Sequence, residues 1–418
     1  MLGQARKPGD AALKRLLYIP HRPPYPPDKG ERIRAWNQVR ALAAAFDVTV
    51  AYAAHTGVEP AAPEPPPSCG ARLVTARATA TARRIRAGMS LLAGRSATEG
   101  YFRCPDLMQK LKALHASKPF DLVFGFCSSV LPYLEALSGA AKAMDLVDVD
   151  SAKWAAYAEQ AAPPRRWLYA REAAAVRRLE ERAIRECGAV FVTSEAEKRL
   201  LGEAGAGVIP VGNGVDCDYF RPSEAEKAGG GLVFVGQMDY PPNVQAVCWF
   251  VDNVWPELRR EAPEAAFAVV GRAPAPAVQR LARREGIQVT GEVPDVRPYL
   301  HGAAGAIAPL RTARGVQNKV LEAMAAGKAV IGSSAALEGL DVTPGADVLR
   351  ADAPQEWVQT ALRLLREPEF RKGLGRNARD TALRLYSWEG RLAPLVAACR
   401  RLCETADASA PAAEAVAR

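Results

Sequence analysis

Two successive series of short apolar segments, each separated from the next by a helical segment, constrain the fold most strongly. In the first half of the chain the apolar segments cover residues 16–20, 48–54, 122–127, 143–149, 189–194 and 208–211. In the second half they cover residues 232–235, 267–270, 287–290, 306–309, 329–332 and 347–350. Most of them do not alternate between apolar and polar residues, which is typical of parallel strands buried on both faces. Strands joined by crossover helices predict a doubly wound parallel sheet in each half.

The helical segments and the break between the two series predict the domain organisation. Helices are expected over residues 33–45, 166–186, 244–260, 316–326 and 354–365. The 418 residues are enough for two Rossmann-like domains, over 14–215 and 232–385, with a polar and then Gly-rich linker over 216–231. A helix over 386–404 is expected to pack back toward the N-terminal domain. Two doubly wound sheets in tandem are expected to face a central cleft that binds ligands at the carboxyl ends of the strands.

Composition excludes several other classes of protein. Hydrophobic residues make up 49% and charged residues 24% of the chain, which is typical of a globular protein. No apolar run approaches the roughly 20 residues that span a bilayer, and no secretory signal is expected, since residues 1–10 lack an apolar core. The eight Cys residues form no CxxC pair and no Cys/His cluster, so we expect reduced thiols, a cytoplasmic protein and no zinc site.

The positive charge is concentrated in the first half. The net charge is +9, and between Lys14 and Asn213 there are 28 Lys and Arg residues against 20 Asp and Glu residues. Residues 163–186 hold many of these arginines together with Trp167 and Tyr169. This segment is either a solvated helix with Glu–Arg pairs or a face for anionic lipid head groups or a lipid-phosphate substrate, at the inner face of the membrane. No nucleic-acid partner is expected, because no recognition motif accompanies the charge.

The residues that carry chemistry lie in RGVQNKVLEAMAAGKAV, residues 314–330. Gly315 permits a tight turn, and a helix is expected to begin near Gln317. Lys319 and Glu322 are three residues apart, so they share one face near the positive end of that helix, where anions bind. A carboxylate one turn further in can accept hydrogen bonds from a ribose diol. Phosphate and ribose side by side describe a nucleotide diphosphate, although an incidental Lys–Glu pair would give the same spacing.

This stretch resembles the donor-binding signature of the retaining GT-B glycosyltransferases of family four, also called group 1. The family pattern is Glu, seven residues, Glu, and then Ala-Met-Ala-x-Gly-x-Pro-Val. The matching residues are Glu322, Ala323, Met324, Ala325, Gly327 and Val330, with Ala329 in place of the Pro. Further blocks resembling the family are FVGQMDYPPNVQAVCWF (234–250), AVVGRAPAP (268–276), VTGEVPDVRPYL (289–300), AIAPLRTARG (306–315) and the hinge NGVDCDYFRP (213–222). IPHRPPYPPDKGERIR (19–34) and MDLVDVDSAKWAAYA (144–158) resemble a subgroup of sugar transferases associated with PEP-CTERM and exopolysaccharide systems.

The resemblance implies a GT-B fold, with the acceptor bound by the first domain and a nucleotide-sugar donor by the second. The donor-binding residues that it implies are Gly30, Gly236, Arg272, Glu292, Val293, Arg311, Arg314, Gly315, Lys319, Val320, Leu321 and Glu322. In this resemblance Glu322 binds the ribose hydroxyls, and Lys319 binds the pyrophosphate with the backbone N–H groups of Val320 and Leu321.

The remaining donor residues have implied roles too. Glu292 and Val293 follow the strand where the family contacts the base through its backbone, and Gly30 approaches the donor phosphate from the first domain. Arg272 faces the cleft from the end of its strand.

Two positions depart from the family pattern. Arg314 stands where the family has its first Glu, which usually touches the donor sugar. Gln237 stands where the family often has an Arg, and no Lys follows nearby. The charge that meets the phosphates must then come from Lys319, Arg272, Arg311 or Arg314. No metal and no other cofactor is expected, because such cations can neutralise the leaving group.

Two residues of the first half are candidates for catalysis. Asp150 lies in the sequence DVDS, which is predicted to end a strand at the mouth of the cleft, where a carboxylate could orient or deprotonate the acceptor hydroxyl. Alternatively, Asp150 or Ser151 caps the helix that follows. His21 lies just past the first strand and could contact donor or acceptor.

The expected function is therefore transfer of a sugar from a nucleotide-diphosphate sugar to a lipid-linked or polysaccharide acceptor, in exopolysaccharide or cell-envelope glycan synthesis. A nucleotide-sugar epimerase of the same architecture and a non-catalytic partner subunit are the alternatives. A dinucleotide-dependent dehydrogenase is not expected, because no GxGxxG follows the first strand.

Overall fold

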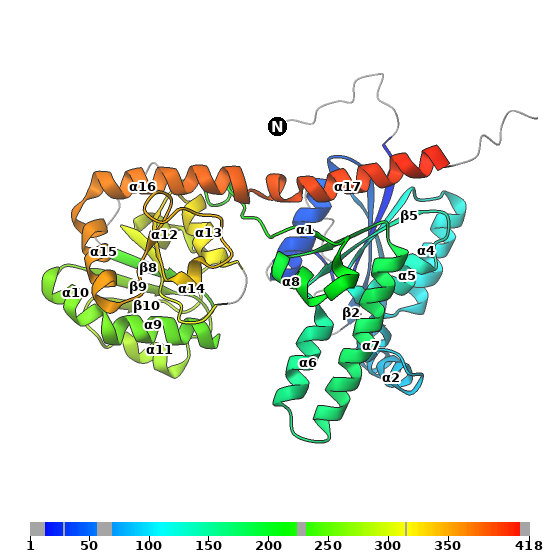
Figure 1. Ribbon diagram of the computed structural model, residues 1–418, viewed down its shortest axis with the longest axis horizontal. Coiled ribbons are helices and arrows are strands. Elements are labelled where there is room, and N and C mark those ends of the chain that lie inside the picture. The colour runs from blue at the N-terminus through cyan, green and yellow to red at the C-terminus, as the bar shows by residue number, and fades with distance from the viewer. Residues whose placement is uncertain (1–12, 28–29, 57–68, 224–230, 314–315, 410–418) are drawn as a thin grey trace, which may run out of the picture. The chain divides into compact units, whose positions relative to one another are not determined.

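The computed structural model describes residues 13–27, 30–56, 69–223, 231–313 and 316–409 (Figure 1). The chain divides into two compact units, one formed by Met1–Gly212 with Leu392–Arg418 and the other by Asn213–Arg391. Each unit contains a single parallel sheet with helices on both faces. The predicted doubly wound α/β fold is confirmed in both halves of the chain.

The sheet of the first unit has the strand order β3-β2-β1-β4-β5-β6-β7, and all neighbouring strands are parallel. Its strands are β1 (Arg15–Pro20), β2 (Asp47–Thr56), β3 (Arg72–Thr79), β4 (Leu122–Phe126), β5 (Ala141–Val147), β6 (Ala189–Val192) and β7 (Ile209–Pro210). Its helices are α1 (Gly30–Ala43), α2 (Ala80–Leu92), α3 (Ala97–Phe102), α4 (Pro105–Ser117), α5 (Leu131–Glu135), α6 (Asp150–Gln160), α7 (Arg165–Glu186) and α8 (Glu195–Leu200), with short turns η1 (Ser128–Val130) and η2 (Gly202–Gly205). The edge strand β3 was not predicted from the sequence.

The sheet of the second unit has the order β10-β9-β8-β11-β12-β13, again with parallel neighbours. Its strands are β8 (Gly231–Val235), β9 (Ala266–Val270), β10 (Ile287–Val289), β11 (Gly305–Ala308), β12 (Ala329–Gly332) and β13 (Leu349–Arg350). Its helices are α9 (Pro241–Asn253), α10 (Trp255–Glu261), α11 (Pro276–Leu281), α12 (Arg297–Gly302), α13 (Asn318–Ala325), α14 (Ser334–Leu337), α15 (Pro354–Arg366) and α16 (Pro368–Thr381), followed by the π-helical turn η3 (Ala382–Tyr386). The predicted helix over 244–260 is two helices, because the chain breaks at Val254 and a new helix begins at Trp255 with Pro256 in its first turn.

Each sheet is buried between its helices, which explains the uniformly apolar strands. The strands β4, β6, β11 and β12 are buried along their whole length. The last helix, α17 (Trp388–Ser409), belongs to the first unit from Leu392 onward. It lies against the start of β6, since a Cβ atom on Gly188 would come within 2.5 Å of the Leu402 side chain. Among the described residues, no helix combines the length and apolar character needed to cross a bilayer.

Candidate functional site

The strand order of the second unit determines where a ligand can bind. The order reverses between β8 and β11, and in open α/β sheets ligands bind outside the carboxyl ends of the strands at such a reversal. The loop after β8 begins with Gly236 and Gln237, and helix α13 follows the loop after β11. The described residues of this unit that are predicted to hold the donor therefore follow the carboxyl ends of its strands.

Two glycines let the loops at this edge lie close together. Gly236 donates its backbone N–H to the carbonyl of Val270 at 3.0 Å. Gly271, which follows β9, has a φ of 151°, and a Cβ atom there would overlap the carbonyl oxygen of Gly236. A side chain at Gly271 would force these backbones apart, so glycine is required for this close approach.

A chain of hydrogen bonds joins helices α13 and α9 to the loops that follow β8 and β9. The Lys319 ammonium on α13 donates to Oδ1 of Asn243 at 3.0 Å, and Nδ2 of Asn243 donates to the carbonyl of Gln237 at 2.9 Å. An Nη atom of Arg272, beyond β9, donates to Oε1 of Gln237 at 3.2 Å. The guanidinium of Arg272 therefore lies beside the position where the family pattern has its own arginine. Asn243 is buried, and sequence reasoning did not assign it a role although it lies in one of the resembling blocks.

Burial shifts the ionisation of the two central groups of α13. It lowers the pKa of Lys319 to about 8, although the negative charge of the nearby Glu322 opposes this shift. The Lys319 ammonium also lies 5.3 Å from the centre of the Phe234 ring. Burial raises the pKa of Glu322 to about 7, and attraction to Lys319 opposes this shift. Each group is costly to keep charged in the free protein, which is typical of side chains that receive a polar ligand.

The other predicted donor residues are placed as follows. The backbone N–H groups of Val320 and Leu321 both donate to the carbonyl of Gln317, at 3.0 and 3.3 Å, so the first turn of α13 is tight. Arg311 stacks its guanidinium 5.0 Å from the ring of Trp249 on α9.

Glu292 and Val293 follow β10 at the same edge of the sheet, the former exposed and the latter half-buried. Arg314 and Gly315 lie outside the described residues. Among the described residues, no group of three His, Cys, Asp or Glu side chains is arranged to hold a metal ion.

The first unit places its two catalytic candidates at the corresponding edge of its own sheet. Nε2 of His21, just after β1, lies 3.3 Å from a carboxylate oxygen of Glu31 near the start of α1. The imidazole stacks on Phe126 and meets the edge of Phe102, and its Nδ1 is buried without a hydrogen-bond partner in the described part of the chain. The hydrogen bond to His21 lowers the pKa of Glu31 to about 2. Glu31 was not predicted as a site residue.

The strand predicted over 143–149 ends at Val147. Asp150 is the first residue of α6, and Val149 precedes it at the N-cap position. Neither Asp150 nor Ser151 caps this helix, and the Ser151 hydroxyl instead donates to Glu180 at 2.5 Å. Burial raises the pKa of Asp150, with further contributions from Asp148 and Glu31 and an opposing one from Lys153. A carboxyl group with a raised pKa is better suited to accept a proton near neutral pH.

Backbone strain accompanies these ends of strands. Three non-glycine residues in the described chain have a positive φ, namely Cys127 (74°), Val147 (69°) and Ala273 (52°). They lie at or just beyond the carboxyl ends of β4, β5 and β9. Such residues are uncommon and concentrate at functional sites. Unlike Gly271, Gly30 is not required to be glycine by its surroundings, because it is exposed and a Cβ atom there would meet nothing within 4 Å.

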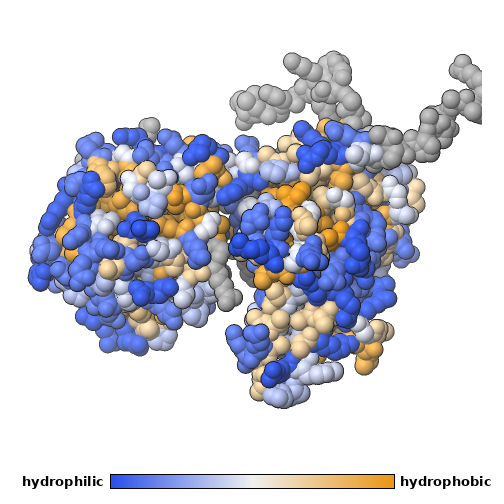
Figure 2. All heavy atoms as spheres, viewed as in Figure 1, coloured by the Kyte–Doolittle hydropathy of each residue, from blue (hydrophilic) through white to orange (hydrophobic). Residues whose placement is uncertain are grey.

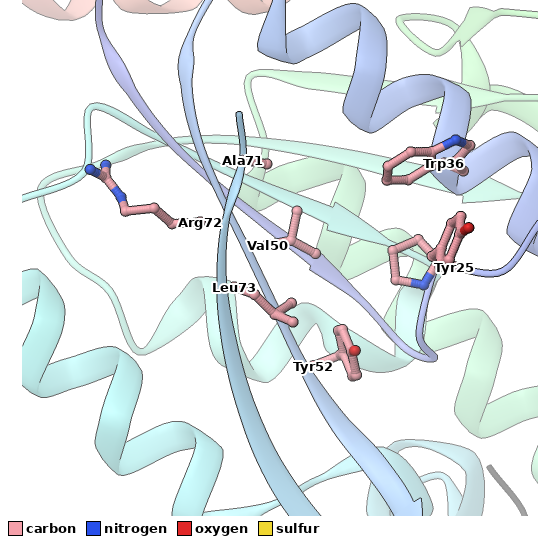
Figure 3. A pocket seen from close by; sticks show the side chains of 8 residues that line it. Tyr25, Trp36, Val50, Tyr52, Ala71, Arg72 and Leu73 are labelled. Carbon is pink, nitrogen blue, oxygen red and sulfur yellow. The ribbon is translucent and has the colours of Figure 1, made fainter. Parts of the chain in front are cut away.

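A small apolar pocket lies elsewhere on the first unit, between α1 and the strands β2 and β3 (Figure 3). Tyr25 and Trp36 line one side, with their ring centres 5.3 Å apart, and Val50 and Leu73 line the sheet side. The pocket includes no predicted site residue.

Comparison with known proteins agrees with this architecture. Residues 229–367 match the family model described as glycosyl transferases group 1, and no curated protein sequence matches the chain. Sucrose-phosphate synthase from Thermosynechococcus elongatus superposes with a TM-score of 0.64 at 17% identity, covering 94% of this chain and 100% of that one. Anabaena HepE in complex with UDP and glucose superposes with a TM-score of 0.59 at 14% identity, covering 94% and 99%. The likeness establishes the GT-B fold, and the family match over the second unit indicates that this chain is a glycosyltransferase.

Proposed function

We propose that the chain transfers a sugar from a nucleotide-diphosphate sugar to a lipid-linked or polysaccharide acceptor, with retention of the anomeric configuration. The proposed setting is exopolysaccharide or cell-envelope glycan synthesis. The observation that carries the proposal is the network from Lys319 through Asn243 and Gln237 to Arg272, with Glu322 one turn further along α13. It combines two cations with a carboxylate at the strand-order reversal, as a diphosphate next to a ribose requires.

The donor-site residues suit the departure of a nucleotide diphosphate. Lys319 and Arg272 would neutralise the charge that develops on the leaving phosphate, which is the kind of electrostatic stabilisation that contributes most to catalysis. Glu322, when ionised, would accept hydrogen bonds from the ribose hydroxyls. HepE supports this assignment, because its structure contains UDP and glucose. A metal is not part of the proposal.

The acceptor is proposed to bind the first unit near Asp150 and His21. Burial of Asp150 raises its pKa toward the range in which it can orient or deprotonate a hydroxyl. His21 would act through contact with substrate. A lipid-linked acceptor lies in a membrane, so the proposal includes peripheral contact between the basic first unit and an anionic membrane surface.

A binding screen followed by product analysis tests the function. Calorimetry with UDP, GDP and their sugar conjugates is expected to identify one base, and the preferred conjugate should yield a glycosylated product only when an acceptor is added. Release of an epimerised sugar without acceptor would indicate an epimerase, and binding without turnover would indicate a non-catalytic subunit. Either result would contradict the proposal.

Arg314 tests the origin of sugar preference separately. Arg314→Glu restores the common residue of the family pattern, so we expect a changed preference among sugar donors of the same base. Unchanged preference and unchanged turnover would show that position 314 does not contact the donor.

A further inference from the structure

Helix α2 in the first unit packs with its polar face inward. Arg83 is only 3% exposed, donates to the carbonyl of Ala53 at 2.6 Å and lies 5.4 Å from the ring centre of Tyr101. Helix α3 packs against the backbone of Arg86 and the side chain of Ser90, since a Cβ atom on Gly100 would come within 2.6 Å of the Arg86 carbonyl oxygen and 2.5 Å of the Ser90 Cβ atom. The face of α2 that packs against the rest of the unit is thus polar, whereas in most globular proteins the inward face of a surface helix is apolar.

The outward face of α2 is apolar. Ile85, Met89 and Leu92 are spaced four and three residues apart, which places them in one stripe along the helix. They are 58%, 63% and 91% exposed. A helix that turns such a stripe to solvent is typical of a protein that uses it to contact something else.

The stripe continues onto the start of α7. An Nη atom of Arg171 donates to the carbonyl of Leu91, and the Glu172 carboxylate accepts from the Ser96 hydroxyl at 2.6 Å, so the end of α2 is tied to this part of α7. Trp167 and Leu168 precede these two residues by one turn on the same faces of α7, and they are 69% and 39% exposed. Figure 1 shows α2 beside the α6–α7 hairpin, and Figure 2 shows apolar surface along this hairpin.

The surroundings of these five residues are strongly basic. Residues 80–95 and 160–171 together contain seven arginines and neither Asp nor Glu. Arg84 and Arg95 are exposed beside the stripe, and Arg165 and Arg166 are exposed beside Trp167. An apolar stripe flanked by exposed arginines matches a surface with acyl chains beneath and negative charge above.

We propose that Ile85, Met89, Leu92, Trp167 and Leu168, here called the α2–α7 apolar patch, insert into the interfacial region of a bilayer that contains anionic phospholipids. The flanking arginines contact the head groups. The inference rests on the membrane contact proposed above for the basic first unit and names the inserting side chains, most of which lie on α2. It does not depend on the donor or the acceptor sugar.

Vesicle flotation with the full chain tests the patch. The protein is expected to float with phosphatidylcholine vesicles that contain phosphatidylglycerol. The double variant Met89→Ser/Leu92→Ser should bind these vesicles at least roughly tenfold more weakly. Leu200→Ser is the matched control, because Leu200 is a 50% exposed leucine of the same unit outside the patch. It should bind as the unaltered chain does.

A second pair of variants separates the charge from the insertion. Arg165→Glu/Arg166→Glu should weaken flotation with anionic vesicles, whereas Arg400→Glu/Arg401→Glu, which reverses two exposed arginines on α17, should not. Tryptophan fluorescence should be quenched by brominated phosphatidylglycerol, and Trp167→Phe should remove most of that quenching.

Several results would overturn the proposal. Absence of flotation, or flotation unaffected by Met89→Ser/Leu92→Ser, would exclude insertion of the patch. If light scattering showed a dimer that the double variant dissociates and no vesicle binding, the patch would contact a second copy of the chain. Nucleotide binding should be equal in all these variants, so a failure of the donor-site assignment is recognised independently.

Discussion

Replacing Lys319 with methionine is expected to make the free protein more stable and its binding of nucleotide diphosphates weaker. Burial lowers the pKa of Lys319 from 10.5 to about 8, and at about 1.4 kcal/mol per pKa unit the charged form costs roughly 3 kcal/mol at pH 7. Loss of the hydrogen bond to Asn243 offsets part of this gain, so we expect a net stabilisation of about 1–2 kcal/mol. A charge-assisted hydrogen bond to phosphate contributes about 1.5–3 kcal/mol, so affinity for UDP or GDP should fall roughly 10- to 100-fold.

The sign of the stability change can be followed with pH. Because the folded pKa of Lys319 lies below 10.5, the unfolded chain binds more protons between about pH 8 and pH 10.5. The stability cost of the ammonium is therefore fully present below about pH 8 and disappears as the pH rises toward 10.5. Urea denaturation at pH 7 and pH 10 should show the advantage of Lys319→Met at the lower pH only.

Lys328→Met provides the matched control. Burial lowers the pKa of Lys328 to about 8 as well, but its ammonium donates to the carbonyl of His301 at 2.6 Å, at the other end of α13 from Lys319. This variant should change the urea midpoint and leave calorimetric affinity for UDP and GDP unchanged. If Lys319→Met bound both nucleotides as tightly as the unaltered chain, or if the two variants lost affinity equally, the donor-site reasoning would be refuted.

Three further outcomes are expected. Gly271→Ala should weaken nucleotide binding and lower the melting temperature, because its Cβ would overlap the Gly236 carbonyl; equal binding by calorimetry would contradict the close approach of the two loops. Arg34→Leu should lower the free energy of unfolding by about 3–5 kcal/mol in urea denaturation, because the fully buried Asp145 loses the Nε–H that donates to it at 2.8 Å. A loss below about 1 kcal/mol would show that this ion pair is not a main contributor to stability. Burial raises the pKa of Glu322 to about 7, so affinity for the nucleotide should fall as the pH drops from 8 to 6 and the carboxylate is protonated. Glu322→Gln should remove this fall, apart from the part caused by titration of the nucleotide itself. Parallel curves of affinity against pH for the variant and the unaltered chain would contradict the assignment.

The sequence predicts the fold well where burial leaves a uniform pattern. Strands such as β4 and β12 are apolar throughout and were placed within one residue of their bounds. Strand β3 was missed because it is an edge strand in which Arg72 and Arg77 are exposed, so it lacks the continuous apolar run of its neighbours.

The site was predicted only as far as local spacing reaches. Lys319 and Glu322 share a helical turn, so three residues of sequence are enough to relate them. The hydrogen bond between Lys319 and Asn243 joins residues 76 positions apart, and the one between Arg272 and Gln237 joins residues 35 apart. No local pattern signals such contacts, because they depend on the order of strands in the sheet.

The placement of α17 has a consequence for how the chain is made. The first unit comprises residues up to Gly212 together with those from Leu392 onward, and Leu395 and Cys399 of α17 are fully buried. A ribosome synthesises the whole contiguous second unit before it supplies this helix, whereas the first unit lacks its last element until the second unit has been made. The C-terminal unit can therefore complete its fold first, although it is synthesised second, and the N-terminal unit is the one exposed to chaperones and proteases for longest.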